Sequence, residues 1–473
     1  MTAVGLDVGT TAVKGIALTE DGAVLARAER GYDFATPRPG WAEQDPELWW
    51  TAAQLVLEDL RGAGTPAGIG LSGQMHGLVA LDAAGTVLRP AILWNDQRTA
   101  AECAEIEERI GLAELIARTG NRALTGFTAP KLLWMRRHEP DLFGRIASIL
   151  LPKDYVRLRL CGERATDVAD ASGTLLFDVG GRHWSGSVLA ALEVDEAWLP
   201  PVLESPEVSG DAGGVPVAAG AGDQAAGALG VGVDRPGPAS VVLGTSGVVF
   251  VALDSFAADP DARVHSFCHA VPGTWHAMGV MLSAAGSLRW LRDVAAPGED
   301  FGALVAEAER WAPGAEGLTF LPYLSGERTP HANPAARGAF VGLSVRHDRG
   351  ALVRAVLEGV AFGLRDSLDL VAGMGAAPAV GRVSGGGARS DLWLRIVASV
   401  LELSLERTAA DEGAAFGAAL LGGVAGGVWA DAREAVAATV RVTDVVEPVG
   451  GWVERYREAR ERFRALYPAL HPG

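Results

Sequence analysis

The chain has 473 residues, of which 49% are hydrophobic and 21% are charged, and its formal net charge is −17. Such a composition excludes an intrinsically disordered chain, and the length indicates about two or three globular domains. The acidic balance excludes nucleic-acid binding as a main activity, because no basic stripe is available to neutralise phosphates.

Cysteine usage and the N-terminal residues indicate where the protein works. Cys103, Cys161 and Cys268 are scattered, so they form no disulfide framework and are typical of a reducing compartment. The N-terminal residues lack the basic and apolar regions of a signal peptide. Two uncharged stretches, 236–253 and 413–430, are interrupted by Gly or Pro, so we expect buried core elements, no membrane association and a cytoplasmic protein.

The first third of the chain alternates between predicted strands and helices. Three apolar runs separated by short turns predict a strand meander at 3–8, 12–18 and 23–32. Asp45 and Pro46 are the N-cap and the first residue of a predicted helix that continues to Leu60. Two further strands and two helical stretches are predicted at 68–72, 78–81, 100–118 and 130–138. This alternation is typical of an α/β fold.

A second copy of the opening pattern follows a Gly- and Pro-rich junction at 232–238. There, a strand at 239–243, a small polar turn at 244–247 and a strand at 248–253 repeat the order of the first hairpin. We therefore predict two α/β domains related by duplication. The predicted domains are 1–234 and 238–473, the second ending in a helix at 452–470.

Three turns rich in Gly and hydroxyl side chains are candidates for binding phosphate, because Gly lets backbone N–H groups converge on an anion. Two of them open the predicted domains, and the third leads into a helix whose N-terminus is a positive dipole end. Two such turns in two domains suggest a nucleotide phosphate chain clamped between them, whereas the Walker and Rossmann glycine patterns are absent. The candidate ATP-binding residues are Thr10, Thr11, Gly244, Thr245, Ser246, Gly386, Gly387 and Ser390.

Two acids and one lysine lie beside these turns or between small residues. Asp7 ends the first strand, so it is placed to hold Mg²⁺ near bound phosphates, although Asp also begins many ordinary turns. Asp223 is the one acid in the Gly- and Ala-rich segment 219–227 and is interpreted either as the N-cap of a helix beginning at Gln224 or as a functional carboxylate. Lys14 is either a phosphate-binding residue or an exposed lysine of the second strand.

Phosphoryl transfer is the chemistry that fits these residues, because it needs positioned charges and a carboxylate that accepts the hydroxyl proton. Asp223 is the candidate for that base. Met75 and His76 lie in a loop between two strands, which suits a small polar ligand, with an ordinary β-turn as the alternative. The cluster at 265–269 contains two His and one Cys, but its spacing is poor for zinc.

Several segments resemble the FGGY family of carbohydrate kinases, from the first hairpin to about residue 427. The phosphate turns are shared widely in that family, whereas the substrate-side segments, such as Gly-Gln-Met-His-Gly at 73–77, resemble the branch that phosphorylates D-xylulose. The segments that carry the resemblance are 7–11, 41–46, 73–77, 93–98, 127–131, 151–155, 244–247, 325–331 and 384–390. The family carries a segment similar to 265–269 without zinc, so the resemblance implies no metal there.

The resemblance implies two actin-like, ribonuclease H-like domains with ATP and the sugar in the cleft between them. It implies that Asp223 is the base on the terminal hydroxyl, that Asp7 lies near Mg²⁺, and that domain closure excludes water. The expected substrates are ATP and D-xylulose, and the implied assembly is a homodimer, although no segment indicates an interface. The expected sugar contacts are Met75, His76, Trp94, Asp223 and Gln224, with Lys14 among the ATP-binding residues.

Gln224 departs from the D-xylulose branch, in which Asn commonly follows the catalytic Asp, while Asp-Gln occurs in other branches such as glycerol kinases. The alternative substrates are ribulose, fuculose, gluconate and glycerol. A sugar sensor and an actin-like filament or chaperone ATPase are the alternatives from other classes. A first strand that begins by Ala3 leaves a sensor no room for a DNA-binding helix-turn-helix, and an ATPase leaves Asp223 and the loop 75–76 unexplained.

Overall fold

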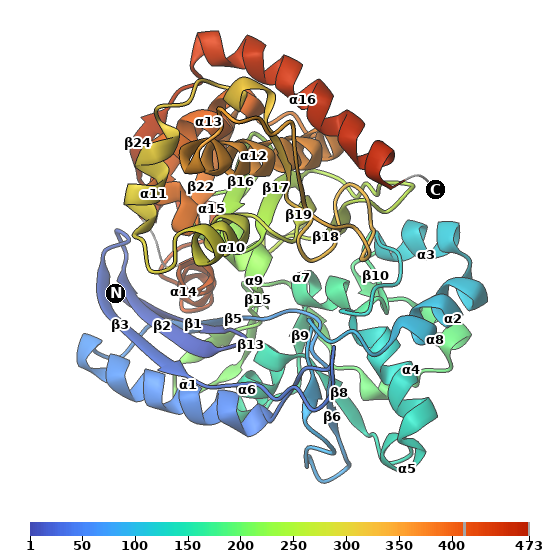
Figure 1. The fold of residues 1–473 in the computed structure, drawn as a ribbon. Helices are drawn as coiled ribbons and strands as arrows, with labels where there is room; N and C mark the ends of the chain where they lie inside the picture. The colour runs from blue at the N-terminus through green and yellow to red at the C-terminus, as the bar shows by residue number, and fades with distance from the viewer. Residues whose placement is uncertain (410–412, 472–473) are drawn as a thin grey trace.

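Two large mixed sheets organise the two halves of the molecule, as Figure 1 shows for the computed structural model, which describes residues 1–409 and 413–471. The first sheet, in spatial order, consists of β13 (Val208–Asp211), β14 (Pro216–Ala218), β5 (Gly68–Gly73), β1 (Thr2–Val8), β2 (Ala12–Thr19) and β3 (Val24–Gly31), and β15 (Ala221–Gly222) also pairs with β5. The second consists of β18 (His265–Cys268), β19 (Trp275–Met281), β17 (Gly247–Leu253), β16 (Pro238–Leu243), β22 (Val380–Ser384), β23 (Ser404–Thr408) and β24 (Val442–Val446).

The two sheets repeat one topology. In each half a hairpin opens the sheet, β1–β2 or β16–β17, and its first strand pairs in parallel with a later strand, β5 or β22. A second parallel strand and an antiparallel edge strand complete both sheets on that side. The repeated strand–turn–strand pattern of the sequence therefore corresponds to a repeated fold.

The first sheet is covered on both faces because its central strand is apolar on both sides. Val4, Leu6 and Val8 pack with α1 (Pro46–Leu60) and α6 (Pro152–Cys161), whereas Ala3 faces the opposite helices. The predicted cap of α1 is confirmed, since Asp45 Oδ1 accepts a hydrogen bond of 3.0 Å from Glu47 N. With period-two alternation, Asp7 lies on the same face as Ala3.

The helix α14 (Ala414–Ala425), from the second half of the chain, covers that opposite face and packs on β1 and β5. Glycine permits the close approach: a Cβ on Gly422 would lie 2.3 Å from Gly70 N. The helix also crosses α9 (Asp223–Gly230), which links the first half to β16. The division between residues 234 and 238 stays a prediction. The helix α14 belongs to the second predicted domain, whereas the strands that it covers belong to the first.

The second sheet has one helical face and one face turned to the first half. Val241, Val249 and Val251 pack with α12 (Arg349–Gly373) and α13 (Asp391–Leu401). Phe250 and Met278, on the other face, share a buried cluster with Met75, Phe127 and other residues of the first half. The helices of this half are completed by α10 (Ala285–Ala295), α11 (Phe301–Ala308), α15 (Ala432–Thr439) and α16 (Gly450–Leu470).

A largely helical insertion between β5 and β13 enlarges the first half. The predicted helical stretch 100–118 is two helices, because Gly111, with φ of 86°, separates them. Its helices are α2 (Ala100–Ile110), α3 (Leu112–Thr119), α4 (Thr128–His138), α5 (Pro140–Phe143), α7 (Val168–Ala171) and α8 (Gly186–Leu192), and its strand pairs include β6 (Val79–Leu81) with β8 (Ser148–Leu150). Across residues 1–409 and 413–471, the structure has no helix of the length and apolarity needed to cross a membrane.

Candidate active site

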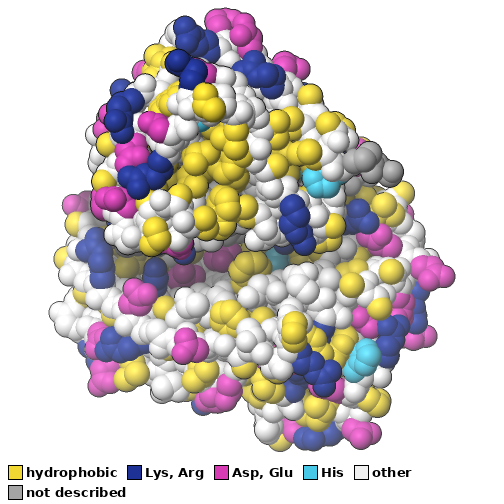
Figure 2. All heavy atoms as spheres, viewed as in Figure 1, with side chains coloured by type: hydrophobic (Ala, Val, Ile, Leu, Met, Phe, Trp, Pro, Cys, Tyr) yellow, Lys and Arg dark blue, Asp and Glu magenta, His cyan; other side chains and the backbone are white. Residues whose placement is uncertain are grey.

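A groove separates the two halves on the face drawn in Figure 2, with acidic side chains on its floor. The carboxyl ends of parallel strands bring the two predicted acids to one sheet edge. Asp7 is opposite Ser72 in the β1–β5 pairing, and the Ser72 hydroxyl donates to Asp7 Oδ1 at 2.9 Å. On the other side of β5, Ala221 is opposite Ser72, and Asp223 follows two residues later at the start of α9.

Asp223 is the first residue of α9, so the expectation that it caps a helix beginning at Gln224 is wrong. The N-cap position is Gly222, and Asp223 Oδ1 accepts a hydrogen bond of 3.3 Å from Gln224 Nε2. Burial, and then the negative charge of Asp7, raise the pKa of Asp223 to about 7. A carboxylate with such a pKa is suited to accept a proton from a hydroxyl near neutral pH.

The first candidate phosphate turn is held by three polar side chains that lie far from it in the sequence. Tyr32 Oη donates to Gly9 O at 2.6 Å, and Gln44 Nε2 donates to Thr10 O at 3.1 Å. Thr10 Oγ1 donates to Gln74 Oε1 at 3.3 Å. The turn is therefore fixed before any ligand binds, which lowers the entropic cost of binding phosphate.

Thr11 and Lys14 are on the exposed side of the same hairpin. Lys14 is opposite Asp7 in the β1–β2 register. Burial raises the pKa of Asp7, while the Ser72 hydroxyl and the Lys14 charge oppose that shift. Lys14 is thus an exposed cation at the same edge as Asp7, and the choice between a phosphate-binding residue and an ordinary strand lysine stays open.

The loop after β5 presents Met75 and His76 beside α9. Met75 packs on Gly222, where a Cβ would lie 2.8 Å from Met75 Cγ. His76 has a φ of 71°, a left-handed conformation that is uncommon for a residue other than Gly. Its Nδ1 lies 2.6 Å from Gly173 O, and burial together with the Lys131 charge lowers the pKa of His76 to about 3. The ring is neutral, and because a carbonyl only accepts, Nδ1 donates and Nε2 remains an acceptor.

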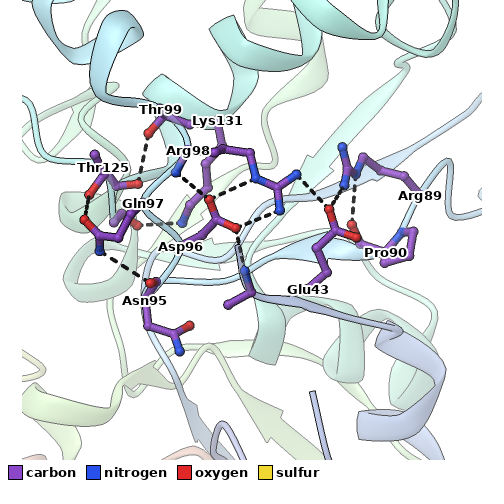
Figure 3. Close-up of polar contacts among 12 residues, drawn as sticks. Glu43, Arg89, Pro90, Asn95, Asp96, Gln97, Arg98, Thr99, Thr125 and Lys131 are labelled. Atoms are coloured by element: carbon purple, nitrogen blue, oxygen red, sulfur yellow. Dashed lines mark hydrogen bonds and ion pairs between the residues drawn. The ribbon is translucent and has the colours of Figure 1, made fainter. Parts of the chain in front are cut away.

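A buried polar network, drawn in Figure 3, fixes the loop that carries Trp94. Asp96 is fully buried and accepts hydrogen bonds from Arg98 Nε at 2.9 Å and Ala42 N at 2.6 Å. Arg98 also pairs with Glu43 at 2.7 Å. With both carboxylates satisfied by charge and hydrogen bonds, the loop has one well-defined position.

Two contacts tie this network to the candidate ligand residues. Trp94, whose surface is 41% exposed, donates from Nε1 to Thr10 Oγ1 at 3.0 Å. The buried Lys131 donates from Nζ to His76 O at 2.8 Å, and burial lowers its pKa to about 7 despite the nearby Asp96 charge. The predicted sugar contact Trp94 therefore touches the predicted phosphate residue Thr10.

The glycine-rich turns of the second half also lie together. The N-terminal end of α10 supports the hairpin tip, since Ala284 N donates to Thr245 O and Ala285 N donates to Gly244 O, both at 2.8 Å. Gly385 has a φ of 87°, and a Cβ on it would lie 2.9 Å from Gly244 N. Only glycine permits this approach of one turn to the other. Ser246, the third residue of the tip, is exposed.

A cavity of about 580 Å³ opens beside this pair of turns, a volume that suits a nucleoside. Its apolar walls come from α10, α11 and α13, and include Leu288, Phe301 and Val305. Gly386, Gly387 and Ser390 line it as well. The Ser390 hydroxyl accepts a hydrogen bond of 3.2 Å from Trp393 N, so it caps α13 at the cavity rim.

Family models match both halves of the chain. The N-terminal domain of the FGGY family of carbohydrate kinases matches residues 2–230, and the C-terminal domain of that family matches residues 239–426. The chain belongs to the FGGY family of carbohydrate kinases. It is an ATP-dependent carbohydrate kinase, and the predicted fold of two actin-like α/β domains is confirmed by solved structures of relatives.

Individual relatives are similar over the whole chain. Xylulose kinase of Escherichia coli (strain K12) is 44% identical over 99% of both chains. The structure of xylulose kinase from Rhodospirillum rubrum is 35% identical with a TM-score of 0.93, covering 100% of this chain and 99% of that one. The structure of gluconate kinase from Lactobacillus acidophilus is 25% identical with a TM-score of 0.94, covering 99% and 98%.

Two places in this FGGY kinase bear on metal binding, a cluster of buried acids and the single carboxylate of Asp7. Among the described residues, the one cluster of three or more metal-ligating side chains is Asp154, Asp167 and Asp170. Lys153 Nζ lies 2.5, 2.6 and 3.3 Å from these carboxylates, so an ammonium already occupies the place of a cation. Asp7 offers one carboxylate beside the phosphate turn, which fits Mg²⁺ because that ion is usually held by one or two carboxylates and by substrate phosphates.

The cluster at 265–269 joins the two halves of the kinase. His265 Nδ1 lies 2.7 Å from Asn121 Oδ1, and Cys268 N donates to Ser172 Oγ at 3.0 Å. His269 Nε2 lies 2.7 Å from Val233 O. Each histidine therefore has a protein partner in the interface, and the segment is structural.

Sequence patterns missed the side chains that hold the site in shape. Ser72, Tyr32 and Gln44 bind Asp7 or the first turn, but each is separated from its partner by a long stretch of chain. Their one signal is that Gln44 belongs to a segment that resembles the family. Lys131 also belongs to such a segment, yet only its burial beneath His76 indicates its role.

Proposed function

We propose that this kinase transfers the γ-phosphoryl group of ATP to the terminal hydroxyl of D-xylulose, giving D-xylulose 5-phosphate. The observation that carries the proposal is the full-length similarity to proteins named xylulose kinase, at 44% identity for one and 36% for another from Bacillus subtilis. The geometry supports it, since Asp223, Met75 and His76 lie around one sheet edge.

Asp223 is the proposed general base. The terminal hydroxyl donates its proton to the Asp223 carboxylate as its oxygen attacks the γ-phosphorus, and ADP leaves. A pKa of about 7 leaves a useful fraction of the carboxylate ionised at neutral pH and still makes it a better base than an ordinary aspartate. Gln224, which donates to Asp223 Oδ1, orients the carboxylate.

The remaining proposed roles are positioning and charge neutralisation. Mg²⁺ held near Asp7 neutralises phosphate charge, and the turns at 9–11 and 244–246 bind the phosphate chain together with Lys14. Gly386, Gly387 and Ser390 line the nucleoside cavity. Met75, His76 and Trp94 contact the sugar, with His76 Nε2 accepting a hydrogen bond from a sugar hydroxyl.

Gluconate is the alternative substrate that a specific observation favours. The gluconate kinase structure has a TM-score of 0.94, so the fold does not separate the two activities. Gln224 stands where the D-xylulose branch commonly carries Asn, so it is the residue that most favours this alternative. Sequence identity favours D-xylulose, since it is 44% with the Escherichia coli xylulose kinase and 25% with the gluconate kinase.

The test is ADP release with Mg-ATP over a panel of D-xylulose, L-ribulose, L-fuculose, D-gluconate, glycerol and no sugar. Selective turnover of D-xylulose is expected. Selective turnover of another member would refute the substrate assignment and leave the carbohydrate kinase in place. The matched control is Asp223→Asn, which keeps the side-chain size, removes the base and is expected to lower turnover about 10²-fold or more.

Three further properties belong to the same proposal. The carbohydrate kinase works in the cytoplasm, where ATP is supplied and where the free thiols of Cys103, Cys161 and Cys268 stay reduced. It assembles as a homodimer, which analytical ultracentrifugation tests directly. Its domains divide at the junction between residues 234 and 238, where limited proteolysis after Arg235, an exposed residue, is the corresponding measurement.

A further inference from the structure

Arg328 belongs to a loop of the second half that is anchored at the end of β19. Thr329 N donates to Val280 O at 3.1 Å, and Val280 N donates to Thr329 Oγ1 at 3.0 Å. One residue before Arg328, Glu327 Oε1 accepts a hydrogen bond of 2.9 Å from Leu282 N. Bonds on both sides of Arg328 therefore fix the backbone from which its side chain extends.

The Arg328 guanidinium has a single side-chain partner among residues 1–409 and 413–471. Its Nη1 lies 3.3 Å from His265 Nε2, and no carboxylate of the described residues forms an ion pair with it. Burial lowers the pKa of Arg328, with only the nearby Glu327 charge acting in the opposite direction. A guanidinium offers several N–H donors in a planar fork, so most of its hydrogen-bonding capacity remains available to a ligand.

The direction of the contact between His265 and Arg328 is settled by the next residue in the network. Asn121 Nδ2 donates to Thr119 O at 2.8 Å and to Ser266 O at 3.0 Å, which leaves Asn121 Oδ1 as an acceptor. His265 Nδ1, at 2.7 Å from that oxygen, is therefore the donor. Its Nε2 is then free to accept from Arg328, which orients one edge of the guanidinium.

An aromatic wall places Arg328 on the sugar side of the active site. His76 packs against Phe127 with ring centroids 4.6 Å apart and the rings tilted by 58°, and Phe127 contacts the His265 ring at 5.8 Å. Phe267 packs against both His265 and His76, at 5.5 and 6.2 Å. Arg328, which reaches this wall through His265, comes from the second half, whereas His76 comes from the first.

The charge of Arg328 also reaches the histidines of this wall. The Arg328 charge lowers the pKa of both His76 and His265. Met75 packs on Gly222, next to Asp223, and the adjacent His76 begins the wall that ends at Arg328. A sugar whose terminal hydroxyl meets Asp223 therefore extends its opposite end along this wall toward Arg328.

We propose that Arg328 is a further sugar-binding residue, which donates hydrogen bonds to the C2 carbonyl oxygen and the adjacent hydroxyl at the end of the ketose away from the phosphorylated carbon. His76 Nε2 accepts a hydrogen bond, whereas a guanidinium only donates, so the two residues read complementary groups. A sugar contact from each half also couples sugar binding to closure of the groove. This inference rests on the proposed function.

The experiment compares Arg328→Met and Arg328→Lys with the wild-type kinase at saturating Mg-ATP. Loss of the charged donors is expected to raise the KM for D-xylulose on the order of 10- to 100-fold, with kcat and the KM for ATP nearly unchanged. The lysine variant keeps the charge without the fork, so an intermediate KM is expected. Arg337→Met, on the same loop but exposed, is the matched control and is expected to keep wild-type constants.

A second readout separates recognition of the ketone from general damage. The wild-type preference in kcat/KM for D-xylulose over D-arabinitol, its analogue reduced at C2, is expected to shrink in Arg328→Met. An unchanged KM with a lower kcat would overturn the inference and assign Arg328 to the transferring phosphoryl group. If Arg328→Met does not fold, the lysine variant decides between these outcomes.

Failure of the proposed function is distinguishable from failure of this inference. Wild-type kinase that turns over another sugar and not D-xylulose would refute the proposed substrate, and the same variants would then be measured on that sugar. An unchanged KM of Arg328→Met for the sugar that the wild type does use would refute the role of Arg328 alone.

Discussion

The rate of the reaction should follow the ionisation of Asp223. Burial and the Asp7 charge raise the pKa of Asp223 to about 7, so a change of pH between 6 and 8 is the perturbation that tests its role as a base. With that pKa, about one-tenth of the carboxylate is ionised at pH 6 and about nine-tenths at pH 8. Ionisation of Asp223 by itself therefore raises kcat/KM for the sugar about tenfold over this interval.

Coupled detection of ADP release from pH 5.5 to 8.5 measures this profile. His76 does not contribute, because its pKa is about 3, whereas Lys131 has a pKa of about 7 and would produce a falling limb as it loses its charge. With both pKa values near 7, the wild-type profile is expected to peak near pH 7, whereas Lys131→Met removes the falling limb and is expected to show the full tenfold rise. A kcat/KM that stays constant between pH 6 and 8 in both proteins would refute the assignment of Asp223 as a base with a raised pKa.

Three further predictions concern stability and binding. Because the folded pKa of Asp223 lies above its ordinary value of 3.8, the folded protein holds a proton that the unfolded chain releases, so stability falls as pH rises from about 4 to 7. Asp223→Asn should therefore raise the free energy of unfolding at pH 8 by up to about 4 kcal/mol, seen as a higher Tm, and an equal effect at pH 4 would contradict this sign. His76→Ala should raise the sugar KM about tenfold and leave the ATP KM unchanged in steady-state kinetics, whereas equal effects would argue against a sugar contact. Gly422→Ala places a Cβ 2.3 Å from a backbone nitrogen of the first sheet and should lower the free energy of unfolding by about 1–3 kcal/mol. Gly451→Ala is the control, because its Cβ meets no atom within 4 Å, and similar Tm values for the two variants would contradict the close packing of α14.

Local patterns in the sequence determined most of the secondary structure near the site. The predicted strands of both opening hairpins correspond to β1, β2, β16 and β17, and the predicted cap at Asp45 begins α1. These predictions succeed because turn residues, caps and apolar runs act over a few residues. The motif segments also carried the resemblance to the family to which the chain belongs.

Tertiary structure alone decided which of these residues act together. Asp7 shifts the pKa of Asp223 only because β1, β5 and β15 end side by side, and α14 covers the first sheet although it lies far along the chain. The contact of the Arg328 guanidinium with His265 likewise depends on the fold, because His265 reaches across the interface between the halves. Burial and charge–charge effects depend on distances in space, so the sequence determined the candidate groups, and the fold determined their ionisation and their partners.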